Sequence, residues 1–232
     1  MPIDRRIPVV LLTGFLGSGK TRLLSRLLRQ PAMRGSAVLI NEFGEIGLDH
    51  WLVEPLAEDV CLLASGCLCC AVRGDLSRSL RELFMRRLRR EIRALDRVFI
   101  ETTGLADPAP VIHTLMQDFF LAERFRLEGV LTTLAVPQGP AQLASHEEAT
   151  RQIVLADRIV LTQCDLAKEG EIASLRARVR GFNPLAEIRE SGLDSSVQGL
   201  IADLGGFSLE GKSDVAKALM VAEDRRVLDS IW

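Results

Sequence analysis

Short runs of apolar residues alternate along this chain with longer stretches in which apolar residues recur every three or four positions. The short runs are typical of buried strands, and the longer stretches are typical of amphipathic helices. Strands are predicted at Val9–Thr13, Ala37–Asn41, Val60–Ala64, Arg97–Glu101, Gly129–Ala135, Arg158–Leu161 and Leu185–Arg189. Helices are predicted at Thr21–Arg29, Asp75–Leu95, Ala109–Asp118, Gln142–Leu155 and Lys168–Val179. This alternation indicates βαβ units, and therefore an α/β fold with a mostly parallel sheet flanked by helices on both faces.

The helix predicted from Asp75 to Leu95 combines one apolar stripe with many arginines. The stripe consists of Leu80, Phe84, Leu88, Ile92 and Leu95. The arginines form either a basic docking face or, as in most helices of this kind, a solvated surface over a core-facing stripe.

Length, composition and charge narrow the class of protein. The chain has 232 residues and a net charge of −2, and no Pro-, Gly- or Ser-rich linker divides it. We expect one domain over residues 1–204 and a tail over residues 205–232, weakly helical around Asp214–Ala222, that is too short for a second domain. The apolar run Ile7–Leu12 is too short to span a bilayer and leads into a glycine-rich loop. We therefore expect a cytoplasmic protein with no nucleic-acid or membrane partner.

The first predicted strand leads into Gly14-Phe-Leu-Gly-Ser-Gly-Lys-Thr21, which fits the phosphate-loop pattern G-x-x-x-x-G-K-[ST]. Its glycines let backbone N–H groups face phosphate oxygens, its lysine neutralises the β- and γ-phosphates, and its threonine hydroxyl ligates Mg²⁺. We therefore predict a P-loop NTPase that binds a nucleoside triphosphate with Mg²⁺. The expected nucleotide contacts are Gly14, Gly17, Ser18, Gly19, Lys20 and Thr21.

A second nucleotide element follows the strand predicted at Arg97–Glu101. Glu101 can hold the Mg²⁺ shell together with Thr21, and the N–H of Gly104, three residues later, can sense the γ-phosphate. Lys20, Glu101 and Gly104 are therefore the expected catalytic residues.

A third element, Thr162-Gln-Cys-Asp165, follows the strand predicted at Arg158–Leu161. In GTPases the Asp of the motif N/T-K-x-D accepts hydrogen bonds from the guanine ring. Because Gln163 occupies the lysine position, the motif is degenerate, and an ordinary turn after a strand is the alternative. We expect Thr162 and Asp165 to contact the nucleotide.

Three of the five cysteines, Cys67, Cys69 and Cys70, fall within four residues. Thiolates at C-x-C-C spacing can converge on one soft or borderline cation such as Zn²⁺. The fourth position would be filled by Glu45, a histidine, water or a partner's ligand. Redox chemistry between neighbouring cysteines, or simple burial, are the alternatives. If the strands are parallel, the segments after them share one sheet edge, and a metal site would lie beside the γ-phosphate.

Together these segments resemble the GTPase domain of the CobW-type metallochaperone family, from about Ile7 to about Leu204. The motifs that carry the resemblance are the phosphate loop, Asn41-Glu-Phe-Gly-Glu45, Gly66–Cys70, Glu101-Thr-Thr-Gly-Leu-Ala-Asp-Pro108, Gln152 with Ala156-Asp157, and Thr162–Asp165. The resemblance implies GTP hydrolysis coupled to delivery of a transition metal, zinc or cobalt, to a client metalloprotein or metal-dependent enzyme. It also implies that Cys67, Cys69 and Cys70 are metal ligands and that Glu45 is a supplementary one.

Several positions depart from the family pattern. Arg22 stands where a second Thr is usual, Gln163 replaces Lys, and Val136 replaces an Asp that follows the fifth strand. These changes leave phosphate binding intact and weaken guanine selectivity. We expect no counterpart of the family's smaller second domain in this sequence, which is either that of a GTPase-only member or of a shortened chain.

The leading hypothesis is a GTP-binding and GTP-hydrolysing metal chaperone with GTP, Mg²⁺ and Zn²⁺ or Co²⁺ as its ligands. We expect a preference for GTP, and slow turnover because Leu105 occupies the place of a water-orienting Gln; Glu42, Glu45 and Asp107 are the nearby candidates for orienting water instead. The alternatives are a nucleotide-gated metal sensor or sequestering protein without significant turnover, and a P-loop ATPase or kinase. The sequence does not fix the oligomeric state, and a homodimer is compatible with it.

Overall fold

The computed structural model describes residues 4–41, 61–65, 72–191, 197–202, 204–210 and 212–229, and all seven predicted strands are found in it. The strands are β1 (Ile7–Gly14), β2 (Ser36–Asn41), β3 (Cys61–Ser65), β4 (Arg97–Glu101), β5 (Phe125–Ala135), β6 (Arg158–Thr162) and β7 (Glu187–Glu190). The α-helices of the described residues are α1 (Lys20–Leu28), α2 (Val72–Leu88), α3 (Ala109–Gln117), α4 (Phe119–Arg124), α5 (Gly139–Ser145), α6 (Glu147–Leu155), α7 (Glu171–Phe182) and α8 (Asp214–Asp229). The short 3₁₀ helices are η1 (Pro31–Met33), η3 (Cys164–Leu166) and η4 (Val197–Leu200).

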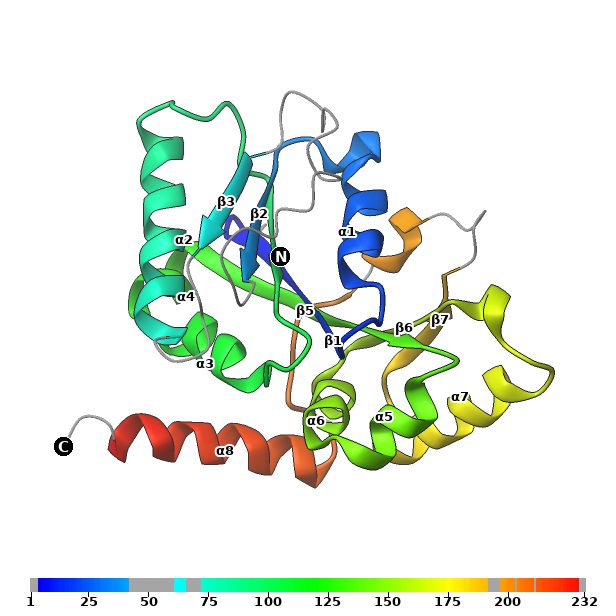
Figure 1. Cartoon of the computed structure of the whole chain (residues 1–232). Coiled ribbons are helices and arrows are strands. Elements are labelled where there is room, and N and C mark those ends of the chain that lie inside the picture. The colour runs from blue at the N-terminus through cyan, green and yellow to red at the C-terminus, as the bar shows by residue number, and fades with distance from the viewer. Residues whose placement is uncertain are drawn as a thin grey trace.

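The strands form a single sheet in the order β3-β2-β4-β1-β5-β6-β7, and every pair of neighbours is parallel. Helices lie on both faces of this sheet (Figure 1), so the predicted α/β architecture is confirmed. In the central strand β1, the consecutive residues 9–12 are completely buried. A strand covered on both faces needs apolar residues throughout, which is why β1 reads as one continuous apolar run.

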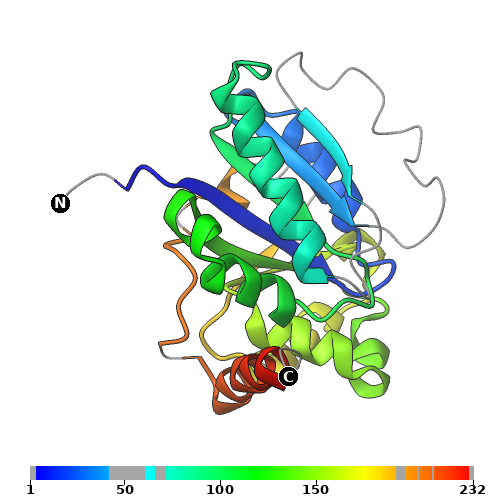
Figure 2. The same ribbon diagram turned by 90° about the vertical axis from the view of Figure 1, so that its left-hand side faces the viewer.

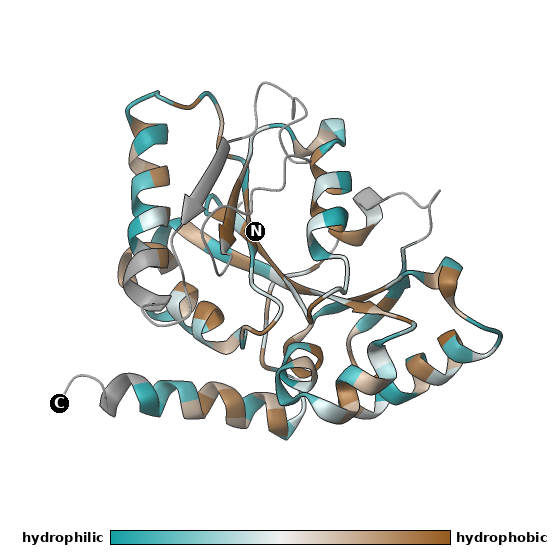
Figure 3. Ribbon diagram, in the orientation of Figure 1, coloured by the Kyte–Doolittle hydropathy of each residue, from teal (hydrophilic) through white to brown (hydrophobic). Residues whose placement is uncertain are grey.

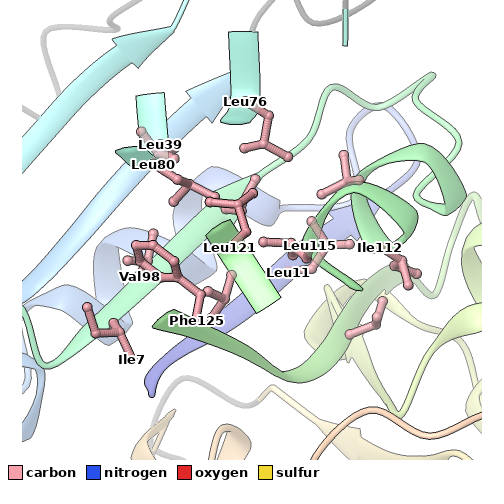
Figure 4. Packing of buried hydrophobic residues seen from close by; sticks show 14 of the residues in the cluster. Ile7, Leu11, Leu39, Leu76, Leu80, Val98, Ile112, Leu115, Leu121 and Phe125 are labelled. Atoms are coloured by element: carbon pink, nitrogen blue, oxygen red, sulfur yellow. The ribbon is translucent and has the colours of Figure 1, made fainter. Parts of the chain in front are cut away.

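Alternate residues of β1 join two different cores. Leu11 packs with side chains of α2, α3 and α4 (Figure 4), and these three helices cover one face of the sheet in Figure 2. Leu12 packs with α1 and η4 on the opposite face. A third core lies around β6, α6 and α7. Figure 3 shows the corresponding pattern, with hydrophobic strands inside and hydrophilic stripes on the helices.

The helix predicted to continue to Leu95 ends at Leu88. Arg90 adopts a left-handed conformation with φ 61°, and the N–H of Glu91 bonds to the carbonyl of Arg86 at 3.0 Å. This is a Schellman C-cap, which glycine usually provides. Leu88 in the last turn is 60% exposed, whereas Leu95 reaches the core from the segment after the helix. The single apolar stripe predicted for this region was therefore wrong at Leu88.

Two other helical predictions also differ from the structure. The segment Gln142–Leu155 contains parts of two helices, α5 and α6, because His146 between them has an extended backbone. Helix α4 was not predicted at all. Its N-cap is Asp118, whose carboxylate accepts a hydrogen bond from the N–H of Leu121 at 3.1 Å.

Residues after 204 pack against the rest of the structure. Helix α8 is longer than the weak pattern around residues 214–222 indicated, and it contacts both α3 and α6. Ala216 and Met220 of α8 are buried in the first core. His113 of α3 lies 2.7 Å from Asp224 of α8. None of the described helices has the length and apolar character needed to cross a membrane.

Candidate functional site

The loop Gly14–Thr21 joins the central strand β1 to α1 at the carboxyl edge of the sheet. Gly17 and Gly19 have φ values of 71° and 87°, a conformation that favours glycine. At Gly14, any side chain would collide with the backbone and side chain of Thr133 on β5. The shape of this loop therefore requires glycine at position 14 and favours it at positions 17 and 19.

The N-terminus of α1 is directed at the same loop. In the part of the chain that the structure describes, no side chain caps this helix and no acidic residue occupies its first turn. Its backbone N–H groups and the positive end of its dipole therefore remain available to a ligand. Lys20 is only 9% exposed, and its amine donates to the carbonyls of Gly14 at 2.8 Å and Phe15 at 3.1 Å. A buried cation beside a helix N-terminus fits an anion such as a phosphate chain.

Thr21 and Glu101 meet beside the loop. The hydroxyl of Thr21 donates to Oε1 of Glu101 at 2.6 Å, and Glu101 is 4% exposed. Glu101 ends β4 and is in register with Leu12 of β1, which brings its carboxylate to the start of α1. A hydroxyl and a carboxylate are oxygen ligands of the kind that Mg²⁺ prefers, so these residues fit a Mg²⁺ ion.

The segment after Glu101 lies directly against the phosphate loop. A Cβ at Gly104 would come within 2.6 Å of the backbone nitrogen of Leu16. One residue after β4, the hydroxyl of Thr102 donates to that of Thr13 at 2.9 Å. The structure therefore brings Lys20, Glu101 and Gly104 to one place, as the sequence predicted, and glycine is the residue that allows the close approach at 104.

Helix α6 holds this segment from the other side. The side-chain amide of Gln152 donates to the carbonyls of Gly104 at 3.1 Å and Ala106 at 3.0 Å. Arg151 pairs with Asp107 at 2.8 Å. The second oxygen of Asp107 accepts the N–H of the first residue of α3 at 2.9 Å. Asp107 is therefore occupied as a helix cap and ion-pair partner, which argues against the water-orienting role considered for it.

Three side chains brace the carbonyl groups of the phosphate loop. Thr162 donates to Ser18 at 2.7 Å, Gln163 donates to Gly17 at 3.0 Å, and Gln142 donates to Leu16 at 3.1 Å. Thr162 and Gln163 belong to the guanine-type motif predicted from the sequence, and in the structure both side chains contact the phosphate loop. Gln142 comes from α5, and nothing near it in the sequence pointed to the site.

Asp165, the residue expected to recognise the base, is exposed in η3. It lies three residues after Thr162, whose hydroxyl donates to the carbonyl of Ser18 in the loop. Gln163 between them has a left-handed conformation with φ 55°.

The predicted metal ligands Cys67, Cys69, Cys70 and Glu45 lie outside the described residues. The strands that precede them do end at the predicted edge: β2 ends at Asn41 and β3 at Ser65, which are paired, and β2 also pairs with β4 next to Glu101. Among the described residues, no three His, Cys, Asp or Glu side chains are grouped closely enough to hold a metal ion.

Cys164 is described, and its surroundings differ from those of a metal ligand. Burial raises the pKa of its thiol, and the nearby carboxylates of Glu190 and Asp165 raise it further. A thiol with a raised pKa stays protonated at neutral pH, whereas metals bind the thiolate.

Comparison with known proteins shows which family and which relatives the sequence matches. The family described as CobW/HypB/UreG, nucleotide-binding domain, matches residues 8–190. The zinc chaperone YjiA of Escherichia coli is 37% identical over 205 residues, which cover 88% of this chain and 63% of the relative. The zinc-regulated GTPase metalloprotein activator 1 of Schizosaccharomyces pombe is 31% identical over 231 residues, which cover 95% of this chain and 54% of the relative. The chain therefore spans less than two thirds of the length of these relatives.

Solved structures support the same fold. A Zn(II)-bound triple mutant of the YjiA GTPase matches with a TM-score of 0.71 and 31% identity, covering 88% of this chain and 63% of that one. The hydrogenase maturation factor HypB of Archaeoglobus fulgidus matches with a TM-score of 0.58 and 20% identity, covering 86% of this chain and 89% of that one. With the loop pattern at Gly14–Thr21, these matches confirm the predicted P-loop NTPase fold.

Proposed function

Because the chain belongs to the CobW/HypB/UreG family of nucleotide-binding domains, we propose that it binds and hydrolyses GTP and couples its nucleotide state to binding and delivery of a transition metal. The observation that carries the proposal is the anion site at Gly14–Thr21, where the buried Lys20 amine, the uncapped start of α1 and the Thr21–Glu101 pair meet. Relatives named as zinc chaperones and as a zinc-regulated GTPase metalloprotein activator support zinc as the metal, with cobalt as the alternative.

Each residue has a specific role in this proposal. The loop residues Gly14, Gly17, Ser18 and Gly19 surround the phosphates with backbone N–H groups, and Lys20 transfers its hydrogen bonds from loop carbonyls to the β- and γ-phosphates. Thr21 and Glu101 would hold Mg²⁺, which supplies positive charge to the same phosphates when bound. The N–H of Gly104 faces the γ-phosphate.

We further propose that GTP is preferred over ATP and that turnover is slow. Asp165 accepts hydrogen bonds from the guanine, while Gln163 is engaged with the loop carbonyl of Gly17 and Thr162 with that of Ser18. The preference therefore depends on one carboxylate. Leu105 is an apolar, exposed side chain beside Gly104 and cannot orient water. The segment between β4 and α3 therefore contributes little to the rate of hydrolysis.

The metal is the cargo in this proposal. Cys67, Cys69 and Cys70 hold it with three thiolates and Glu45 completes the shell, so that the metal can leave to a client metalloprotein or metal-dependent enzyme. These thiolates need a reducing compartment, which favours the cytoplasm. A homodimer is the assembly we propose to test first.

Metal analysis of the purified protein, with and without GTP and Mg²⁺, is the deciding experiment. We expect one zinc-class ion per chain, a content that depends on the nucleotide, and slow release of phosphate. Nucleotide-dependent metal content without turnover would indicate a metal sensor or sequestering protein instead. ATP binding with no bound metal would indicate a P-loop ATPase or kinase and would overturn the proposal.

A further inference from the structure

Two consecutive residues of α6 hold the loop that connects β4 to α3. We propose that Gln152 and Arg151 are positioning residues that keep Gly104 at the γ-phosphate. The inference rests on the proposed function in one respect, namely that the loop Gly14–Thr21 binds a nucleoside triphosphate.

Gln152 is a fixed support rather than a surface contact. Its side chain is 1% exposed, and its amide group donates to two carbonyls of the loop, those of Gly104 and Ala106. Its own backbone carbonyl accepts the hydroxyl of Thr132 on β5 at 2.9 Å, so the residue is tied to the sheet. Movement of the loop would therefore leave buried polar groups without partners, which is costly.

Arg151 supports the far end of the same loop. Its guanidinium binds Asp107 at 2.8 Å and Glu147 at 2.6 Å, and Asp107 caps the start of α3. The support from Gln152 and Arg151 therefore spans residues 104–107. Between these contacts the side chain of Leu105 is exposed and adds no packing of its own to the segment.

The position of this loop affects only one part of the nucleotide. Gly104 already lies against Leu16 of the phosphate loop, where its N–H would meet the γ-phosphate of a triphosphate and nothing in a diphosphate. The affinity for a ligand falls in proportion to the fraction of protein in the binding-competent conformation. Loosening the loop should therefore weaken binding of GTP and leave binding of GDP unchanged.

The test compares Gln152→Leu with the native chain, using fluorescent GDP and a non-hydrolysable GTP analogue. Losing two buried hydrogen bonds should lower the affinity for the GTP analogue about tenfold, while the affinity for GDP changes less than about twofold. The matched control is Asn183→Leu. Asn183 is also buried and donates to three carbonyls of α6 and its C-cap, those of Ile153, Val154 and Ala156, none of which belongs to the loop that Gln152 holds. This control should lower stability and leave the ratio of the two affinities unchanged.

A second variant keeps the test informative if Gln152→Leu does not fold. Arg151 is partly exposed, so Arg151→Leu should fold, and it should lower the affinity for the GTP analogue in the same direction by a smaller factor. Equal losses for GDP and the GTP analogue, or no loss for either, would overturn the positioning role while leaving the proposed function intact. If the native chain binds neither nucleotide, the proposed function itself fails.

Discussion

The contacts of Lys212 allow a sharp test of whether the residues after 204 are held to the rest of the domain. Its side chain is 8% exposed, and its amine donates to Asp157 at 2.7 Å and to the carbonyls of Leu155 at 3.2 Å and Ala156 at 3.0 Å. The other oxygen of Asp157 accepts the N–H of Val130 at 2.7 Å. One buried ion pair therefore joins residue 212 to the end of α6 and to β5.

The substitution Lys212→Met leaves the carboxylate of Asp157 buried without its cation. Removing one partner of a buried ion pair costs about 3–5 kcal/mol, which is a large fraction of the roughly 5–15 kcal/mol that stabilises a typical domain. The double variant Lys212→Met/Asp157→Asn should recover much of this loss, because asparagine carries no charge and can still accept the N–H of Val130.

The loss should also depend on pH. Burial raises the pKa of Asp157, while the charge and hydrogen bond of Lys212 act to lower it. In Lys212→Met this lowering is gone, so the folded-state pKa rises further above the unfolded value. A raised folded pKa gives stability that is complete below the unfolded pKa and is lost as pH rises through the folded pKa. The deficit of the variant should therefore be largest near pH 7 and should shrink as the pH falls toward the ordinary range of a carboxyl group.

Urea unfolding followed by circular dichroism measures the free energy of unfolding for the single and double variants. A deficit below about 1 kcal/mol at pH 7, or one that the second substitution does not reduce, would refute this reasoning. That result would mean that this ion pair contributes little to holding the predicted tail, residues 205–232, against the rest of the domain.

The remaining predictions concern the ligands. Lys20→Ala should fold normally and lose triphosphate affinity by about a hundredfold or more, because charged hydrogen bonds to the phosphates disappear; near-normal affinity would contradict the anion site. In competition binding, Asp165→Ala should abolish the preference for GTP over ATP, a loss of about 1.5–3 kcal/mol, and unchanged selectivity would favour an ATPase. Chelator competition should show weaker metal binding in Cys69→Ser and unchanged binding in Cys164→Ser; equal effects would mean that the ligand set is wrong.

The strands could be predicted because their physical requirement is local. A parallel strand covered on both faces needs consecutive apolar residues, and runs such as Val9–Thr13 meet that need without reference to the rest of the chain. Helix ends were less predictable. Arg90, just after the end of α2, has a left-handed conformation that glycine usually adopts. Because arginine stands there, and the surrounding arginines suit a helix as well as a turn, the sequence did not mark this helix end.

The residues of the candidate site also differ in how readily the sequence identifies them. Gly14, Lys20 and Thr21 could be identified as candidates because one short segment contains both the turn and the groups proposed to bind phosphate, so that their spacing is itself the signal. The residues that hold this segment in place lie far away in the sequence: Gln142 binds a carbonyl 126 positions earlier, and Gln152 binds one 48 positions earlier. A glutamine amide on a helix looks the same in the sequence whether it faces water or a loop carbonyl. Chemistry that depends on local spacing is therefore readable from one sequence, while the support that fixes its geometry requires the fold.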